Sequence, residues 1–217
     1  MQFNIHTHVS SGQATEIVNS TGNQVEFQLF SVGIHPWDSE NSTLKIGGLS
    51  EKLNSKRCIA LGEIGLDKLK GPSMEIQLSV FKEQIALSEE LELPVIIHCV
   101  RAWNELKQVK KALNPKQIWI FHGFTKTRLY KEVLENGFYI SIGTAVLTNE
   151  KVQDILLAIP NDRLFLETDN SNCLISAVYQ KVSELKKLPL HELEQILENN
   201  FKRVFTRWKI GSNEQNL

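Results

Sequence analysis

Two histidines separated by one residue stand near the start of the chain, in the segment His6-Thr7-His8. The apolar run that leads into them predicts a strand, and in an extended chain residues i and i+2 point to the same side. Two imidazoles on one side of a strand can reach the same metal ion. A His-x-His pair alone is a modest signal, because a single histidine after a strand is more often a surface or hydrogen-bonded residue.

Other residues that can bind metals follow later predicted strands. Together with the pair they form a set that we expect to hold one or two divalent ions: His6, His8, Glu63, His98, His122 and Asp169. Mixed imidazole and carboxylate ligands suit zinc, manganese, iron or nickel, and suit magnesium less well. Six ligands are more than one catalytic zinc needs, so a pair of ions bridged by a carboxylate fits the set. Such a pair can acidify a shared water and support hydrolysis.

The elements that must position these residues alternate along the chain. Short apolar runs predict seven strands, and several are apolar at nearly every position, as parallel strands covered on both faces should be. These strands are expected at residues 3–6, 27–33, 58–64, 94–99, 117–123, 137–143 and 163–168. Segments with helical character are expected at residues 10–22, 74–91, 105–113, 129–137, 151–159 and 188–208. Gly137 is placed as a helix C-cap.

This succession of strands and helices predicts an α/β fold, with a (β/α) TIM-type barrel as the first choice and an open doubly wound sheet as the alternative. We expect one domain spanning residues 1–217. The eighth strand of a barrel is not visible, so the barrel is expected to be irregular or incomplete there. In a barrel the C-terminal ends of all strands line one mouth, where active sites lie. Every expected metal ligand falls at such a strand end.

Composition narrows the class of protein. The net charge of −1 at pH 7 argues against nucleic-acid binding through overall positive charge, so any site for a polyanion must be local. Cys58, Cys99 and Cys173 have no metal-binding or disulfide-framework spacing, which favours a reducing compartment. We see no signal peptide and no stretch long and apolar enough to cross a membrane. A cytoplasmic protein without a membrane partner is therefore expected.

Seven motifs occur in order over nearly the whole chain: HTH (6–8), VGIHPWD (32–38), GEIGLD (62–67), PVIIHCVRAW (94–103), FHGF (121–124), LETD (166–169) and NNFKRVF (199–205). With them the chain resembles the TatD-like family of metal-dependent hydrolases, a branch of the amidohydrolase-type barrels. GEIGLD together with ETD is the most specific pair.

The resemblance implies a two-metal nuclease that acts on DNA from an end. It implies one ion held by His6, His8, Glu63 and Asp169, and a second held by Glu63, His98 and His122. Glu63 would bridge the two ions, and Asp169 would orient or deprotonate the attacking water. His35 and Arg101 would lie near the substrate phosphate.

One segment departs from the family pattern. Members usually carry a proline soon after ETD, followed by a loop rich in arginine, glycine, lysine and asparagine. Here residues 170–180 read NSNCLISAVYQ, without the proline or the loop. The metal-binding residues are all present, so the departure concerns the grip on a nucleic acid more than the hydrolytic chemistry. The predicted first helix, residues 10–22, is also short.

Further residues allow two interpretations each. The basic stretch 98–132 could track a nucleic acid or form solvated helix faces, and Arg101 could bind phosphate or make a surface ion pair. Three aromatic residues could stack on bases but are more simply caps of the core: Trp37, Trp103 and Phe124. Asp67 could contact substrate or close its turn. Close backbone approach is expected at Gly62 and Gly65, and Asn200 and Arg203 are expected to pin the last helix.

Three functions are compatible with these residues. The first is a phosphodiester hydrolase, of the DNase or exonuclease type, that acts on nucleic acid ends or a small phosphodiester. The alternative is a hydrolase of the same fold acting on a small amide, ester or lactone. The third is a non-catalytic binding protein, which the complete ligand set argues against.

Overall fold

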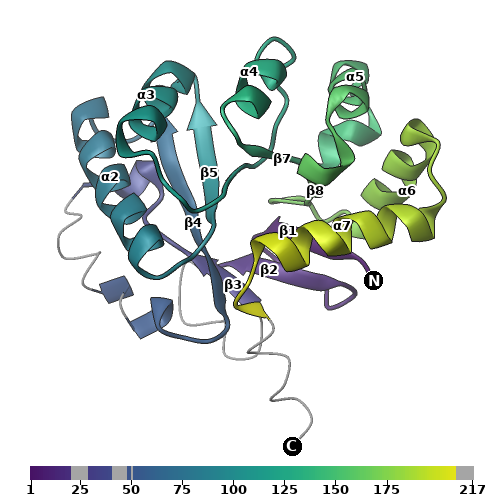
Figure 1. Ribbon diagram of the computed structural model, residues 1–217, viewed down its shortest axis with the longest axis horizontal. Coiled ribbons are helices and arrows are strands. Elements are labelled where there is room, and N and C mark those ends of the chain that lie inside the picture. The colour runs from purple at the N-terminus through teal and green to yellow at the C-terminus, as the bar shows by residue number, and fades with distance from the viewer. Residues whose placement is uncertain (21–28, 41–47, 50, 209–217) are drawn as a thin grey trace, which may run out of the picture. The chain divides into compact units, whose positions relative to one another are not determined.

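The computed structural model describes residues 1–20, 29–40, 48–49 and 51–208. In these residues eight strands form one sheet in the order β1 to β8, so each strand neighbours the next in the sequence (Figure 1). The strands are β1 Phe3–Thr7, β2 Thr15–Asn19, β3 Leu29–Val32, β4 Cys58–Asp67, β5 Val95–Val100, β6 Trp119–Phe121, β7 Tyr139–Ile142 and β8 Leu164–Leu166. This is the strand order of a TIM-type barrel, and it confirms the predicted fold class. A doubly wound sheet would instead reverse its order part-way.

Helices follow most of the later strands. They are α2 Met74–Glu90, α3 Trp103–Leu113, α4 Tyr130–Glu135, α5 Glu150–Ala158, α6 Ile175–Lys186 and α7 Leu190–Val204. Short 3-10 turns lie at η1 Pro36–Asp38, η2 Thr144–Leu147 and η3 Asn161–Arg163. In the described part of the chain, no helix is both long and apolar enough to span a membrane.

Contacts divide the chain into two compact units. Unit 1 comprises residues 1–18 and 120–206, and unit 2 comprises residues 19–119 together with the segment from Arg207 onward. The single domain expected across residues 1–217 stays a prediction.

Unit 2 is organised around β4, in which all ten residues are buried. Helices α2 and α3 lie along β4 and β5 (Figure 1). A β-carbon on Gly65, where φ is +151°, would come within 1.9 Å of the His98 carbonyl oxygen, so only glycine fits. A β-carbon on Gly62 would meet the Ile96 side chain at 2.7 Å. The predicted close approach at both glycines is confirmed.

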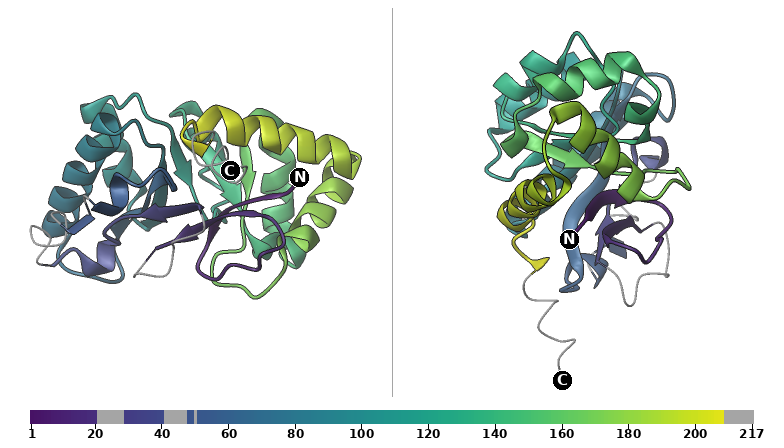
Figure 2. Two further views of the ribbon diagram at one scale, coloured as in Figure 1. Left: turned by 90° about the horizontal axis from the view of Figure 1, so that it is seen from below. Right: turned by 90° about the vertical axis from the view of Figure 1, so that its right-hand side faces the viewer.

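Unit 1 brings its two terminal strands together. An isolated parallel bridge joins Thr7 of β1 to Asp169, beyond the end of β8, in place of a continuous ladder. The expected irregularity of the barrel is found at this junction. Helix α7 packs beside β1 (Figure 2), with the rings of Phe3 and Phe201 stacked 4.3 Å apart.

The C-terminal part of α7 is fixed to the rest of unit 1 by Asn200 and Arg203, the two residues expected to hold this helix. Asn200 Nδ2 donates to the carbonyl oxygens of Asn161 and Leu164, at 2.7 and 2.9 Å. Arg203 donates to the Tyr139 hydroxyl and to the Asp162 carbonyl. Their predicted structural role is confirmed.

The strand that the sequence did not reveal is the second, and not the last. The helix predicted at residues 10–22 is wrong, because Thr15–Asn19 form β2, which pairs in parallel with β1. Residues 21–22 of that prediction, and residues 27–28 of the next predicted strand, lie outside the described residues. The β-branched residues Thr15, Ile17 and Val18 favour the extended chain.

The prediction that every metal ligand lies at a strand end is also corrected. His6, Glu63 and His98 lie within β1, β4 and β5, while His8 and His122 come directly after β1 and β6. Strand β4 runs past Glu63 because Gly65 lets its pairing with β5 continue to Asp67 and Val100. The ladder shifts register between Leu61 and Ile64, next to Glu63.

The predicted helices at 74–91, 105–113, 129–137, 151–159 and 188–208 are confirmed as α2, α3, α4, α5 and α7. Gly137 follows α4 with φ +77° and donates to the Leu134 carbonyl, as a C-cap glycine does. Helix α6 was not predicted. Its apolar stripe of Ile175, Val178, Tyr179 and Val182 is buried and has helical spacing.

A buried carboxylate at the start of β2 closes the loop between β1 and β2. Glu16 accepts hydrogen bonds from the hydroxyls of Ser10 and Ser11, at 2.6 and 2.8 Å, and from the backbone N–H groups of Ser11 and Gly12. Burial alone would raise the pKa of Glu16, but these hydrogen bonds together lower it. The ionised carboxylate therefore stabilises the folded state.

Replacing Glu16 by alanine should lower the free energy of unfolding by about 1–3 kcal/mol at pH 7, because four part-buried hydrogen bonds to its carboxylate are lost. Since the pKa of Glu16 is lowered on folding, this contribution is complete above its unfolded pKa of about 4.3 and disappears as pH falls through the folded value. Urea unfolding at pH 7 and at low pH measures both effects, with the exposed Glu184→Ala as control. An equal loss at both pH values would contradict the assignment.

Candidate metal centre

The unit 1 cluster consists of His6, His8 and Asp169. The Nε2 atoms of His6 and His8 lie 3.6 and 3.4 Å from Asp169 Oδ1. His6 is fully buried, while the side chain of His8 is 27% exposed, so one face of the cluster is open to solvent. A divalent ion with tetrahedral bonds of about 2.0–2.2 Å keeps its ligand atoms roughly 3.3–3.6 Å apart. The donor types and their spacing therefore fit a divalent ion.

The backbone fixes this cluster. Asp169 N–H donates to the His6 carbonyl at 3.0 Å, and His8 N–H donates to the Asp169 carbonyl at 3.0 Å. Asp169 has φ +52°, a left-handed conformation that is uncommon for a residue with a β-carbon. The chain thus turns sharply at the position where its carboxylate faces the two imidazoles.

The two imidazoles also determine the charge of Asp169. Burial would raise the pKa of this carboxyl, but hydrogen bonds from His6 and His8, together with the positive charges of His6 and His122 when protonated, lower the pKa well below its usual range. Asp169 is therefore an anion at neutral pH, as a ligand for a cation or an acceptor for water must be.

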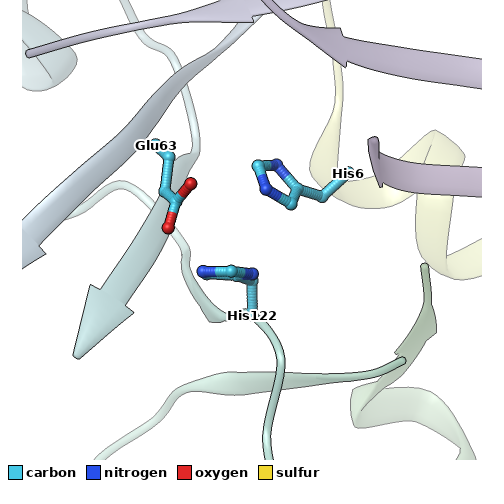
Figure 3. Close-up of side chains that lie close together, drawn as sticks. All are labelled: His6, Glu63 and His122. Atoms are coloured by element: carbon cyan, nitrogen blue, oxygen red, sulfur yellow. The ribbon is translucent and has the colours of Figure 1, made fainter. Parts of the chain in front are cut away.

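His122 belongs to the same unit. Its ring lies next to that of His6 (Figure 3). The two ring centroids are 4.5 Å apart. On its other side, Nδ1 lies 3.3 Å from Oε1 of the buried Glu167. Figure 3 also draws Glu63, which comes from β4 in unit 2.

The unit 2 cluster consists of His35, Glu63 and His98. Oε1 of Glu63 lies 2.6 Å from His98 Nδ1 and 3.5 Å from His35 Nε2. Glu63 is 6% exposed, and its N–H donates to the Asn19 side chain, which fixes the backbone there. A buried carboxylate between two imidazoles again offers the donor types that divalent ions bind.

Asp67 lies behind His98. Its Oδ2 is 3.3 Å from His98 Nε2 and accepts the Trp37 indole N–H at 2.7 Å. Its Oδ1 accepts the backbone N–H groups of Leu69 and Lys70. Burial would raise the pKa of Asp67, but the hydrogen bonds from Trp37 and from the Leu69 backbone lead the contributions that lower it. Of the two roles considered for Asp67, closing its turn is confirmed.

His35 differs from the other members of its cluster. It is the N-cap of η1, and its Nδ1 accepts the Trp37 backbone N–H at 3.3 Å. A neutral imidazole that accepts at Nδ1 carries its proton at Nε2. Nε2 is therefore a hydrogen-bond donor, directed at Glu63, and has no lone pair for a metal. This agrees with the expected role of His35 near a substrate anion.

Arg101 follows β5 with φ +52° and is exposed. Among the described residues its guanidinium has no ion pair, so the alternative of a surface ion pair finds no support. The rest of the basic stretch is partly used inside the protein. Lys110 lies over the Trp119 ring, and Lys126 lies over the Phe121 ring.

The aromatic residues considered for base stacking divide into two kinds. Trp103 and Phe124 are 7% and 0% exposed, so their interpretation as parts of the core is confirmed. Trp37 is 45% exposed, although Asp67 anchors its indole N–H and Lys70 Nζ lies 4.1 Å from its ring. Trp37 is thus an exposed residue in a fixed position and not a core cap.

Two polar residues around the clusters escaped the sequence analysis. Glu167 lies two positions before Asp169, a spacing that places both on one side of an extended segment. That spacing was the available signal. Asn19, which holds the Glu63 backbone, lies in the strand that was mistaken for a helix and gave no signal.

Comparison with known proteins decides the family. Residues 2–206 match the family model described as TatD related DNase. The chain belongs to this TatD-related DNase family. A Bacillus subtilis protein named uncharacterized metal-dependent hydrolase YabD is 31% identical over 202 residues, which cover 84% of this chain and 79% of YabD. The protein named 3'-5' ssDNA/RNA exonuclease TatD from Erwinia tasmaniensis is 30% identical over 204 residues, or 81% of this chain and 77% of that protein.

Solved structures of TatD-family proteins share the fold. The TatD homolog YjjV from Escherichia coli superposes with a TM-score of 0.75 at 26% identity, over 84% of this chain and 78% of YjjV. A TatD-family hydrolase from Entamoeba histolytica gives a TM-score of 0.76 at 18% identity, over 95% and 98% of the two chains, and supports the fold alone. The protein is therefore a TatD-family metal-dependent hydrolase with a His, Glu and Asp cluster.

The replacement His35→Asn tests whether His35 binds metal. Asparagine can still accept the Trp37 N–H as an N-cap but has no ring Nε2. We expect Zn²⁺ affinity to change by less than about threefold, whereas His98→Asn in the same unit should reduce it about tenfold or more. Calorimetric titration of both variants measures the difference. Equal losses would make His35 a ligand.

Proposed function

We propose that this TatD-family protein hydrolyses phosphodiester bonds at the ends of single-stranded nucleic acids or in small phosphodiesters. The observation that carries the proposal is the unit 1 cluster, in which two imidazoles and an ionised carboxylate have the spacing of metal ligands. Support for the substrate class comes from the Erwinia tasmaniensis relative, named as a 3'-5' ssDNA/RNA exonuclease.

We propose two divalent ions, of zinc, magnesium or manganese. His6, His8 and Asp169 would hold one, and His98 and His122 would hold the other, with Glu63 shared between them. A pair of divalent ions supplies Lewis acidity to a phosphoryl group and lowers the pKa of a water. The proposed sets combine imidazoles with carboxylates, the donor types that suit divalent ions of this kind.

The chain's own residues would then perform three tasks. Asp169, kept ionised by the lowered pKa of its carboxyl, accepts a hydrogen bond from the attacking water and orients it. His35 donates from Nε2 to a phosphoryl oxygen, because its Nδ1 is already an acceptor for Trp37 N–H. Arg101 offers its guanidinium to the remaining phosphate oxygens, a geometry that suits phosphate.

The segment after Asp169 limits how many phosphates of a nucleic acid the protein can bind. Residues 170–174, NSNCL, lead directly into α6 and contain no lysine or arginine. Sequence-independent affinity for nucleic acids comes mainly from phosphate contacts by such residues. We therefore propose that only a few phosphates are gripped and that terminal nucleotides are removed.

The same segment favours a second candidate function. Residues 170–174 are a short segment without lysine or arginine, which suits a compact substrate. The same ions and carboxylate could hydrolyse a small amide, ester or lactone. The exposed Arg101 guanidinium argues for phosphate. Parallel assays on a generic phosphodiester, an amide and a lactone distinguish the two functions.

Loss of the Asp169 carboxylate should abolish most turnover. In Asp169→Asn the left-handed backbone is tolerated, since asparagine adopts it more readily than most residues. We expect hydrolysis of bis(p-nitrophenyl) phosphate with Mn²⁺ to fall about 10²–10⁴-fold, as it should also in excess chelator. The exposed Asp162→Asn is the matched control in unit 1. A loss as small as that of the control would assign Asp169 a structural role only.

Substrate length should matter little. We expect the kcat/KM on a dinucleotide, a short oligomer and a long single strand to agree within about tenfold, with a salt slope corresponding to a few phosphates at about −0.7 each. Arg101→Asn, which keeps the left-handed backbone, should raise KM for each of them, while Lys111→Asn on α3 should not. A steep gain with length would show an extended nucleic-acid track instead.

A further inference from the structure

Glu167 is a fully buried carboxylate that the reaction proposed above does not use. It follows β8 directly and is 0% exposed. Its Oε1 accepts the Gly123 backbone N–H at 2.7 Å and lies 3.3 Å from His122 Nδ1. Its Oε2 is buried and has no hydrogen-bond partner among the described residues.

Backbone capping does not account for this burial. The carboxylates with structural roles satisfy both oxygens: Glu16 receives four hydrogen bonds, and Asp67 receives hydrogen bonds on Oδ1 and Oδ2. Glu167 receives a single backbone N–H and leaves one oxygen unsatisfied, which is costly in a buried place. The other described partner of this carboxylate is the His122 ring, whose Nδ1 lies against the same Oε1.

The contact with Glu167 determines which ring nitrogen of His122 carries the proton. An ionised carboxylate only accepts hydrogen bonds, so a bond between Glu167 and His122 requires the ring proton on Nδ1. The neutral ring then keeps its lone pair on Nε2. Gly123, with φ +55°, turns the chain so that its N–H holds the same Oε1 in place.

We propose that Glu167 is a positioning residue, which fixes the protonated nitrogen and the orientation of His122 so that the ring presents Nε2 to a divalent ion. Carboxylates in this position behind a ligating histidine raise its basicity and commonly contribute 10–100-fold in metal affinity. The inference rests on the proposed function in one respect, the assignment of His122 as a metal ligand.

The test compares Glu167→Gln with a matched control. Glutamine keeps the shape of the side chain but removes its charge, so the preference for a proton on Nδ1 weakens. The control is Ser141→Ala, because Ser141 in β7 of the same unit is also buried with a side-chain oxygen that lacks a hydrogen-bond partner among the described residues. Zn²⁺ titration by calorimetry should show about a 10–100-fold loss for Glu167→Gln and little change for the control.

A spectroscopic readout keeps the test independent of variant folding. In the full-length wild-type protein loaded with ¹¹³Cd²⁺ and labelled with ¹⁵N-histidine, coupling to cadmium should appear at Nε2 of His122, and the proton should be on Nδ1. Cadmium coupling at Nδ1, or metal affinity unchanged in a folded Glu167→Gln, would overturn the proposal.

A third variant separates this inference from the proposed function. If His122→Ala leaves Zn²⁺ affinity unchanged, His122 is not a ligand, and the proposed metal set and the inference are both wrong. If His122→Ala weakens binding and Glu167→Gln does not, the metal set stands and only the role of Glu167 is rejected. Neither readout requires a substrate.

Discussion

Backbone hydrogen bonds between the end of β1 and the segment after β8 hold the unit 1 cluster together. Asp169 N–H donates to the His6 carbonyl and His8 N–H donates to the Asp169 carbonyl, so side chains 163 positions apart in the sequence meet at a fixed spacing. Asp169 stays ionised despite its partial burial, because hydrogen bonds from the two imidazoles keep the pKa of its carboxyl low. The proposed role of Asp169 toward metal and water depends on that charge.

In each unit, the hydrogen bond at Nδ1 distinguishes histidines that sequence patterns treat alike. His35 accepts a backbone N–H at Nδ1, whereas the same atom of His122 faces a carboxylate. The first arrangement makes the opposite nitrogen a donor suited to an anion, and the second makes it a lone pair suited to a cation. Two imidazoles of one protein can therefore have opposite roles.

The sequence predicted the strand order and the candidate ligands because buried parallel strands are apolar at nearly every position and polar residues stand out where they end. It missed β2 because a strand of only five residues carries too little periodicity to distinguish strand from helix. It placed Glu63 at a strand end because the continuation of β4 depends on the backbone contact of Gly65 with β5, which no pattern records. The role of Glu167 likewise depends on packing around a turn.

The most direct test of this account is an anomalous-difference map of crystals grown with Mn²⁺ or Zn²⁺. The account predicts a strong peak about 2.0–2.3 Å from Nε2 of His6, Nε2 of His8 and a carboxylate oxygen of Asp169. A second peak should contact His98 and Glu63 but not Nε2 of His35. Ordered density for these side chains with no peak between them, or a peak bound by His35, would contradict the account.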